Sequence, residues 1–299
     1  MAMLQITDLH KRFGDKEVLR GVELSVPSNS VFGFIGKNGS GKTTTMKTIL
    51  GLLKADKGDI VVGGEKVVYG QTATNRFIGY LPDVPEFYSF MTAAEYLRFC
   101  GEITGMTPAE CRSRCDELLT LVGLFGERHR IKGFSRGMKQ RLGIASALFN
   151  RPKLLICDEP TSAHDPVGRK EILDILSAAR EQTTIVFSTH ILTDIERICT
   201  DAAFLDNGVI TVQGTLPEIK SRVRCDAYRL EVMHEADLRS LCQTFGAMRQ
   251  TEPTVACFDE RDLPLSQVLH TIAERHISLI KLERQVPTLE SLFMEVAQG

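Results

Sequence analysis

The sequence predicts an α/β fold for most of the chain and a smaller α+β unit at its C-terminal end. Two stretches, KLLICDEP (153–160) and TTIVFSTH (183–190), contain the continuous apolar runs of buried parallel strands. A glycine-rich loop, GKNGSGKT (36–43), separates the apolar stretch SVFGFI (30–35) from a segment with helical spacing. After residue 220 the element order changes to β-α-β-β-α-β, which is typical of ferredoxin-like units.

The remaining elements follow from hydrophobic spacing. Strands are predicted within 4–13, 22–35, 60–67, 76–87 and 202–214, the last as a hairpin with an Asn-Gly turn. Two amphipathic helices are predicted over 92–124, and a final helix over 288–297. We therefore expect a first domain over 1–220, with a helical part over about 84–150, and an accessory ferredoxin-like α+β domain over 221–299.

The composition excludes several classes of protein. Hydrophobic residues make up 43% and charged residues 25% of the 299, as in ordinary soluble proteins. The net charge of −2 provides no broad basic field for nucleic acid. The eight cysteines form no paired C-x-x-C set, and no apolar run reaches the roughly 18 residues of a membrane span. We expect a cytoplasmic chain without signal peptide, disulfides or nucleic-acid partner.

GKNGSGKT fits the phosphate-binding pattern G-x-x-x-x-G-K-[ST] in the strand-loop-helix context that the pattern requires. Its glycines let backbone N–H groups close around phosphate oxygens. Lys42 is expected to pair with the β- and γ-phosphates of ATP, and the Thr43 hydroxyl to hold Mg²⁺. The predicted nucleotide-binding residues are Gly36, Lys37, Asn38, Gly39, Ser40, Gly41, Lys42, Thr43 and Thr44.

LLICDEP places two acidic side chains where a buried strand ends. A strand of this kind delivers Asp158 to the carboxyl edge of the sheet, where Mg²⁺ would lie. Glu159 follows, so one carboxylate can serve the metal and the other can polarise the attacking water. We predict Asp158 as a metal ligand and Glu159 as a catalytic residue.

Two further motifs have more than one interpretation from the residues alone. His190 ends a strand that should lie beside LLICD, so its ring either caps the next helix or contacts the γ-phosphate. FSRGMKQRL (134–142) begins a helix with a serine and a glycine. Such a start either caps the helix or binds an anion.

Together these motifs resemble those of the nucleotide-binding subunits of ABC transporters, over roughly residues 1–220. GKNGSGKT resembles the phosphate loop of this family, LLICDEP its Mg²⁺ strand, FSRGM its signature loop and SAHD (162–165) its D-loop. His190 matches the switch histidine, which favours a catalytic role. The resemblance implies an ABC-type P-loop ATPase fold, with a mixed-sheet core, an antiparallel β subdomain and a helical insert.

In this family two cassettes pack head to tail with ATP between them. The resemblance therefore implies a homodimer in which Ser135, Gly137 and Met138 contact the ATP held by the phosphate loop of the second copy. The N-terminus of a helix suits this role because its N–H groups and dipole attract anions.

The sequence departs from the family pattern at several positions. Arg136 replaces a glycine of the signature loop, and His164 replaces the usual leucine of the D-loop. Asp83 stands where the family has the Q-loop glutamine; it is either a ligand of Mg²⁺ or water, or a turn residue between two prolines. Phe13 matches the aromatic residue that stacks on adenine, since stacking requires only a ring face.

The elements YLPD, FSRGMKQR and TLESLFMEV most resemble the ATPases of ABC-2-type exporters. This branch implies a separate transmembrane permease as partner and a peripheral location at the inner face of the cell membrane. An ABC-type ATPase that acts outside transport is the alternative, although the single cassette and the lack of a long heptad run count against it. A P-loop kinase would explain GKNGSGKT but not the other motifs.

Overall fold

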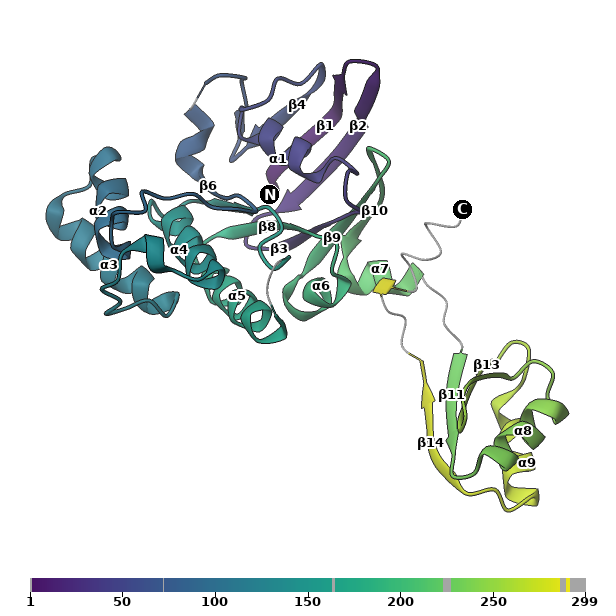
Figure 1. Ribbon diagram of the computed structural model, residues 1–299. Coiled ribbons are helices and arrows are strands. Elements are labelled where there is room, and N and C mark those ends of the chain that lie inside the picture. Colours follow the sequence, from purple (N-terminus) through teal and green to yellow (C-terminus); the bar gives the residue numbers. More distant parts are fainter. Residues whose placement is uncertain (1, 72, 163–164, 223–226, 286–288, 291–299) are drawn as a thin grey trace. The chain divides into compact units, whose positions relative to one another are not determined.

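The computed structural model describes residues 2–71, 73–162, 165–222, 227–285 and 289–290 (Figure 1). The chain divides into two compact units, Met1–Leu216 and Pro217–Gly299. The division falls slightly before the boundary that we place after residue 220. The helix predicted over 288–297 lies largely outside the described residues.

The central sheet of the first unit has six strands: β3 (Val31–Ile35), β6 (Ile78–Leu81), β7 (Leu154–Cys157), β8 (Thr184–Thr189), β9 (Asp201–Asp206) and β10 (Val209–Thr215). Their order is β10-β9-β3-β8-β7-β6, and all neighbours are parallel except the β9–β10 hairpin. Every residue of β3, β7 and β8 is buried, which explains their continuous apolar sequences.

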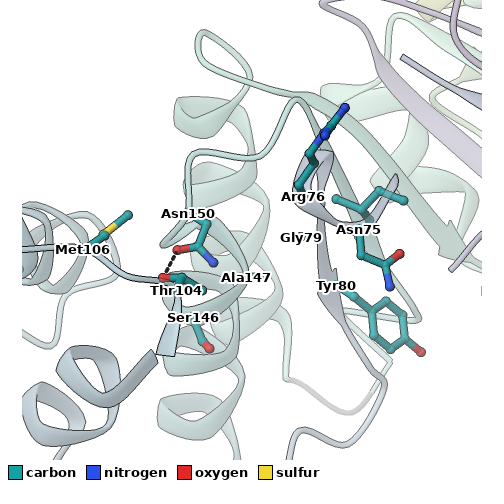
Figure 2. A pocket seen from close by; sticks show the side chains of 10 residues that line it. Asn75, Arg76, Gly79, Tyr80, Thr104, Met106, Ser146, Ala147 and Asn150 are labelled. Atoms are coloured by element: carbon teal, nitrogen blue, oxygen red, sulfur yellow. Dashed lines mark hydrogen bonds between the residues drawn. The ribbon is translucent and has the colours of Figure 1, made fainter. Parts of the chain in front are cut away.

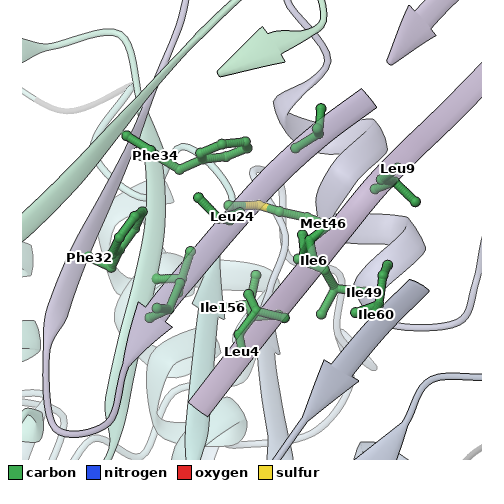
Figure 3. Packing of buried hydrophobic residues seen from close by; sticks show 14 of the residues in the cluster. Leu4, Ile6, Leu9, Leu24, Phe32, Phe34, Met46, Ile49, Ile60 and Ile156 are labelled. Atoms are coloured by element: carbon green, nitrogen blue, oxygen red, sulfur yellow. The ribbon is translucent and has the colours of Figure 1, made fainter. Parts of the chain in front are cut away.

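An antiparallel sheet in the order β2-β1-β4-β5 forms the second layer. Its strands are β1 (Ala2–Phe13), β2 (Lys16–Pro27), β4 (Lys57–Val62) and β5 (Glu65–Lys66). Met46 and Ile49 of α1 (Lys42–Ile49) share one buried cluster with Leu4 and Ile6 of the antiparallel sheet and Phe32 of the central sheet (Figure 3). This packing fixes the start of α1, and with it the phosphate loop, against both sheets.

The chain between β6 and β7 forms a helical part, whose α-helices are labelled in Figure 1. It contains α2 (Ala93–Ile103), α3 (Pro108–Leu121) and α4 (Arg136–Leu148), with two short 3₁₀ helices nearby at Ala73–Phe77 and Ile131–Gly133. Capping boxes at Thr92–Glu95 and Thr107–Glu110 start α2 and α3 by satisfying free N–H groups. The two helices predicted over 92–124 are thus α2 and α3.

The chain after β7 and β8 enters helices that return it to the other end of the sheet. These are α5 (Pro166–Ala179), capped by Asp165, and α6 (Leu192–Ile198). The β9–β10 hairpin turns at Asn207 and Gly208, whose φ angles of 46° and 80° fit a type I′ turn. α7 (Leu216–Arg222) follows β10.

The second unit contains β11 (Ala227–Val232), α8 (Glu235–Thr244), β12 (Arg249–Glu252), β13 (Val255–Asp259), α9 (Leu265–Glu274) and β14 (Leu279–Arg284). Its antiparallel sheet has the order β12-β13-β11-β14. Leu230 and Phe258 of the sheet share a separate core with Leu238 of α8 and Val268 of α9. In the described part of the chain, no helix is both long and apolar enough to span a bilayer.

Candidate active site

The carboxyl ends of β3, β7 and β8 meet at one edge of the central sheet because these neighbouring strands are parallel. The phosphate loop follows β3, Asp158 and Glu159 follow β7, and His190 follows β8. This edge is where open α/β sheets bind their ligands. The structure thus brings together three segments that are far apart in the sequence.

The conformation of the phosphate loop requires glycine at specific positions. Gly39 and Gly41 have φ angles of 81° and 114°, which side chains strongly disfavour. A Cβ atom on Gly36 would lie 2.5 Å from Ser40 Oγ and 2.6 Å from the Leu205 carbonyl oxygen. Glycine is therefore needed at Gly39 and Gly41 for the backbone conformation and at Gly36 for close packing within the chain.

Lys42 is the first residue of α1 and is 6% exposed. Its Nζ donates hydrogen bonds to the carbonyl oxygens of Gly36 at 2.7 Å and Lys37 at 3.2 Å. The same Nζ lies 3.1 Å from Glu159 Oε1. The ammonium is thus held inside the loop and paired with a carboxylate of the neighbouring strand.

A single hydroxyl connects the two acidic residues. Ser188 Oγ donates to Asp158 Oδ1 at 2.7 Å and accepts from the Glu159 N–H at 2.9 Å. Asp158 is 3% exposed, so its carboxylate is shielded from bulk solvent. Glu159 has a φ of 47°, a left-handed conformation that costs on the order of 1–3 kcal/mol for such a residue. Strain of this kind is common at functional sites.

The Glu159 carboxylate has a hydrogen-bond partner on one side and an ion-pair partner on the other. His190 Nδ1 lies 3.0 Å from Glu159 Oε2, and the opposite oxygen faces Lys42. The imidazole is about half exposed, whereas the Glu159 side chain is mostly buried. From the sequence, His190 could be either a helix cap or a residue of the site; its ring bonds a carboxylate of the site.

A cavity of about 560 Å³ opens between these segments. Its size suits a small-molecule ligand. Glu159, which lines this cavity, has its Oε1 buried without a partner of hydrogen-bond geometry, and the same holds for Ser40 Oγ in the phosphate loop. The cavity is lined by Phe13, Val18, Asn38, Gly39, Gly41, Lys42, Thr43, Thr44, Asp83 and Glu159.

Asp83 and Phe13 enter this cavity from outside the phosphate loop. Asp83 Oδ1 accepts a hydrogen bond from Ser162 Oγ at 3.1 Å, so it is tied to the loop after β7. Phe13 is 49% exposed, with Lys11 Nζ 5.4 Å from its ring centre. An exposed ring at the mouth of a cavity can stack on a planar ligand.

The signature loop does not line this cavity. Ser135 caps α4 by accepting a hydrogen bond from the Met138 N–H at 3.2 Å, and Ser135 and Arg136 are exposed. Gly137 lies in the same first turn. Within one chain these residues act as a helix start. His164 lies outside the described residues.

Two residues of the site are not predicted by the sequence patterns. Ser188 bonds both acidic residues, and Val18 lines the cavity from β2. Ser188 had a signal, because it lies next to the end of the strand that carries His190. Val18 had no such signal in the sequence, because its position at the cavity depends on the packing of the antiparallel sheet.

The oxygen groups near Lys42 suit Mg²⁺, which prefers hard oxygen ligands and keeps few protein contacts. Thr43 and Asp83 line the cavity. Asp158 is not among its lining residues; its buried carboxylate lies next to Glu159 in the chain and is held by Ser188. The neighbouring Cys157 does not compete for a metal, because burial raises the pKa of its thiol and keeps it protonated.

A family model described as ABC transporter matches residues 19–162. The chain is 36% identical over 99% of its length to the uncharacterized ABC transporter ATP-binding protein YxlF of Bacillus subtilis, all of which is covered. It is 33% identical to the linearmycin resistance ATP-binding protein LnrL of B. subtilis, with 98% of each chain covered. The bacitracin transport ATP-binding protein BcrA of Bacillus licheniformis is 38% identical over 74% of this chain and 72% of its own.

Solved structures agree with these relatives. The ATP-binding subunit of an ABC transporter matches with a TM-score of 0.66 and 33% identity, over 74% of this chain and 92% of that one. The ADP-bound cassette MJ1267 matches with a TM-score of 0.64 and 26% identity, over 73% and 92%. The chain belongs to the ATP-binding proteins of ABC transporters. It is an ATPase with the predicted P-loop α/β fold.

Proposed function

We propose that this chain is the ATP-hydrolysing subunit of an ABC-2-type exporter and works as a dimer on a separate membrane permease. The observation that carries the catalytic part is the chain of contacts from Lys42 through Glu159 to His190 at the cavity edge. The names of two relatives, in bacitracin transport and linearmycin resistance, support an export role.

ATP binding begins with an exchange of partners at Lys42. Its ammonium is paired with Glu159 and with two loop carbonyl oxygens. The β- and γ-phosphates offer stronger partners to this ammonium, so their binding releases Glu159. Backbone N–H groups of the glycine loop hold the phosphate oxygens, and Phe13 stacks on the adenine ring.

Thr43, Asp158 and Asp83 are the residues that would hold Mg²⁺. When bound, the ion supplies charge neutralisation on the phosphates. Asp158 is already oriented by Ser188, so its carboxylate requires little rearrangement. Asp83 is tied to Ser162, which keeps it on the same side of the cavity.

Glu159 then acts on the attacking water. Once free of Lys42, its carboxylate accepts a proton from water as the oxygen attacks the γ-phosphorus. The bond from the γ-phosphorus to the bridging oxygen of ADP breaks, and phosphate leaves. His190, 3.0 Å from Glu159, orients this carboxylate and donates to the γ-phosphate.

The signature loop completes the site of a second copy. Ser135, Gly137 and Met138 stand at the start of α4, outside the cavity of their own chain. The N-terminus of an α-helix presents backbone N–H groups and a dipole that favour binding of an anion such as the γ-phosphate. ATP thereby joins two chains, and hydrolysis removes the group that joins them.

The surface beside Asp83 offers a place for the permease. Tyr88 and Phe90 are 52% and 61% exposed, and Tyr88 packs on Phe99 at 5.7 Å between ring centres. Tyr80, three residues before Asp83, lines a second cavity of about 470 Å³ (Figure 2). Residues of the 3₁₀ helix before β6 and of α4 also line this cavity. We propose that a cytoplasmic segment of the permease binds at this surface, which places the chain at the inner face of the membrane.

The test of the catalytic proposal is the variant Glu159→Gln. It should bind ATP, form a stable dimer and fail to turn over. Wild-type turnover in this variant would overturn the assignment. Copurification with a membrane chain of several spans tests the partner, and recovery with ribosomes or DNA alone would favour a role outside transport. We assign no catalytic residue to the second unit, which we propose as an accessory domain.

A further inference from the structure

A buried carboxylate lies behind the active site and has no part in the proposed mechanism. Asp194, in the first turn of α6, is 3% exposed. Its Oδ2 accepts a hydrogen bond from Thr161 Oγ1 at 2.7 Å, and its Oδ1 accepts one from Arg169 Nη2 at 2.6 Å. Thr161 is fully buried. Each carboxylate oxygen therefore has its own partner, in a different segment of the chain.

This carboxylate links the segments that carry the catalytic pair. Thr161 lies in the turn that follows Glu159, and Asp194 lies on the helix that follows His190. The Thr161–Asp194 hydrogen bond is thus a second connection between these segments, behind the contact of Glu159 with His190. Arg169 of α5 supplies the opposite charge that a buried carboxylate requires.

The backbone at Glu159 explains why such an anchor matters. Glu159 has a φ of 47°, and a conformation of this kind persists only where surrounding contacts fix it. Its N–H is held by Ser188 Oγ, and its carbonyl oxygen accepts from the Ser162 N–H at 3.2 Å. Thr161 follows Glu159 by two residues in the same turn, and Asp194 holds its side chain. Loosening it would let Glu159 relax from its strained position.

We propose that Asp194 is a positioning residue that acts through Thr161 to hold the Glu159 carboxylate in its catalytic orientation. Asp194 does not line the cavity of the site. Arg169 pairs with Oδ1 of Asp194 and thereby leaves Oδ2 to accept from Thr161. This inference rests on the proposed role of Glu159 in hydrolysis.

A purely structural role for the same contacts would consist of joining α5 to α6. The chain contains a matched control for this alternative. Arg197 Nη2 of α6 lies 2.8 Å from Asp174 Oδ1 of α5, a pair that joins these two helices away from the turn after β7. Arg197→Ala therefore loosens the same pair of helices without touching Thr161.

The test compares Thr161→Val, Thr161→Ser and Arg197→Ala in the full chain by steady-state ATP hydrolysis. Valine keeps the shape of threonine and removes the hydroxyl, so kcat should fall by about tenfold or more while KM stays within about twofold, because small misplacements act on the reacting geometry. Serine keeps the hydroxyl and should restore most of kcat. Arg197→Ala should leave kcat unchanged. Equal losses in Thr161→Val and Arg197→Ala would overturn the inference.

A double variant shows whether the effect passes through Glu159. In the Glu159→Gln background, Thr161→Val should not further reduce the slow residual phosphate release, because residues that act as one unit are not additive. If Thr161→Val lowers phosphate release in the Glu159→Gln background by the same factor as in the wild type, Thr161 acts through a group other than Glu159. That result would overturn the inference.

The outcomes separate this inference from the proposed function. Wild-type turnover of Glu159→Gln contradicts the proposed function itself. An inactive Glu159→Gln with wild-type kcat in both Thr161→Val and Asp194→Asn contradicts only the positioning role. If Thr161→Val does not fold, Arg169→Lys takes its place, because lysine keeps the charge but not the planar fork. An unchanged kcat in a folded Arg169→Lys would then contradict the inference.

Discussion

The two units of this chain place their charged residues in opposite ways. At the carboxyl edge of the central sheet, Lys42, Asp158 and Asp194 are all less than one tenth exposed. In the second unit the pairs Arg229–Glu252 and Arg239–Glu235 are exposed to solvent. Buried charges are costly and are retained where function needs them, whereas exposed pairs contribute little. The contrast agrees with our proposal that the catalytic residues lie in the first unit.

The largest difference in ATP turnover is expected between two variants that each neutralise one carboxylate, one in each unit. Glu159→Gln should lower ATP turnover by about 10²–10⁴-fold, because the water loses its base. ATP affinity should be kept or raised, since Lys42 loses its partner within the chain. The matched control is Glu283→Gln, which breaks an exposed pair with Lys281 and should leave turnover unchanged. A large loss of ATP turnover in Glu283→Gln would contradict the expected difference between the two units.

A core truncation in the second unit tests its independence from the site. Leu230→Ala removes a fully buried side chain from the sheet of that unit and should cost about 2–5 kcal/mol of its free energy of unfolding. Denaturant titration should show an earlier transition for this unit, with ATP affinity of the first unit unchanged. Loss of ATP binding together with the early transition would show that the two units fold as one.

Ser135→Ala separates the two roles of the signature loop. The change removes the side-chain cap of α4 and should cost about 1 kcal/mol of stability. If Ser135 also binds the ATP of a second copy, ATP-dependent dimerisation should weaken more than this loss explains, while the isolated chain keeps its ATP affinity. Sedimentation with and without ATP measures the dimerisation. Nucleotide titration at low protein concentration measures the ATP affinity of the isolated chain. A collapse of affinity in the isolated chain would place Ser135 at its own site.

The smallest effect is expected at a partly buried carboxylate of the second unit, that of Asp259. Hydrogen bonds from the Arg261 side chain and N–H lower the pKa of Asp259 from 3.8 to about 2. A depressed pKa stabilises the fold above the unfolded value, and this contribution is lost as pH falls from about 4 toward about 2. NMR titration of Asp259 should show the low pKa, and Arg261→Gln should move it back toward the ordinary value. An unchanged pKa of Asp259 in Arg261→Gln would rule out the guanidinium as the cause of the shift.

Much of the architecture could be predicted because it depends on local patterns. The apolar runs of β3, β7 and β8, the glycine loop and the Asn-Gly turn each carry their own signal in a short window. The parallel order of β7 and β8 also follows from their sequence type. These local signals are enough to place the phosphate loop, Asp158, Glu159 and His190 at one sheet edge.

What the sequence did not predict depends on contacts between distant segments. Ser188 reaches Asp158 across adjacent strands, and Thr161 reaches Asp194 across 33 positions of sequence. The left-handed backbone of Glu159 is likewise set by its surroundings, because glutamate has no local preference for it. The closeness of Lys42 to Glu159 arises only when β3 and β7 are placed in one sheet.

The central claim is that ATP is held by the phosphate loop of one chain and the signature loop of another. Mixing Lys42→Ala with Ser135→Arg tests it most directly, since each variant lacks one half of the site and should be inactive alone. In mixed dimers the intact phosphate loop of one chain faces the intact signature loop of the other, so about a quarter of wild-type ATP turnover should return. No recovery in a mixture that demonstrably forms mixed dimers would contradict the claim.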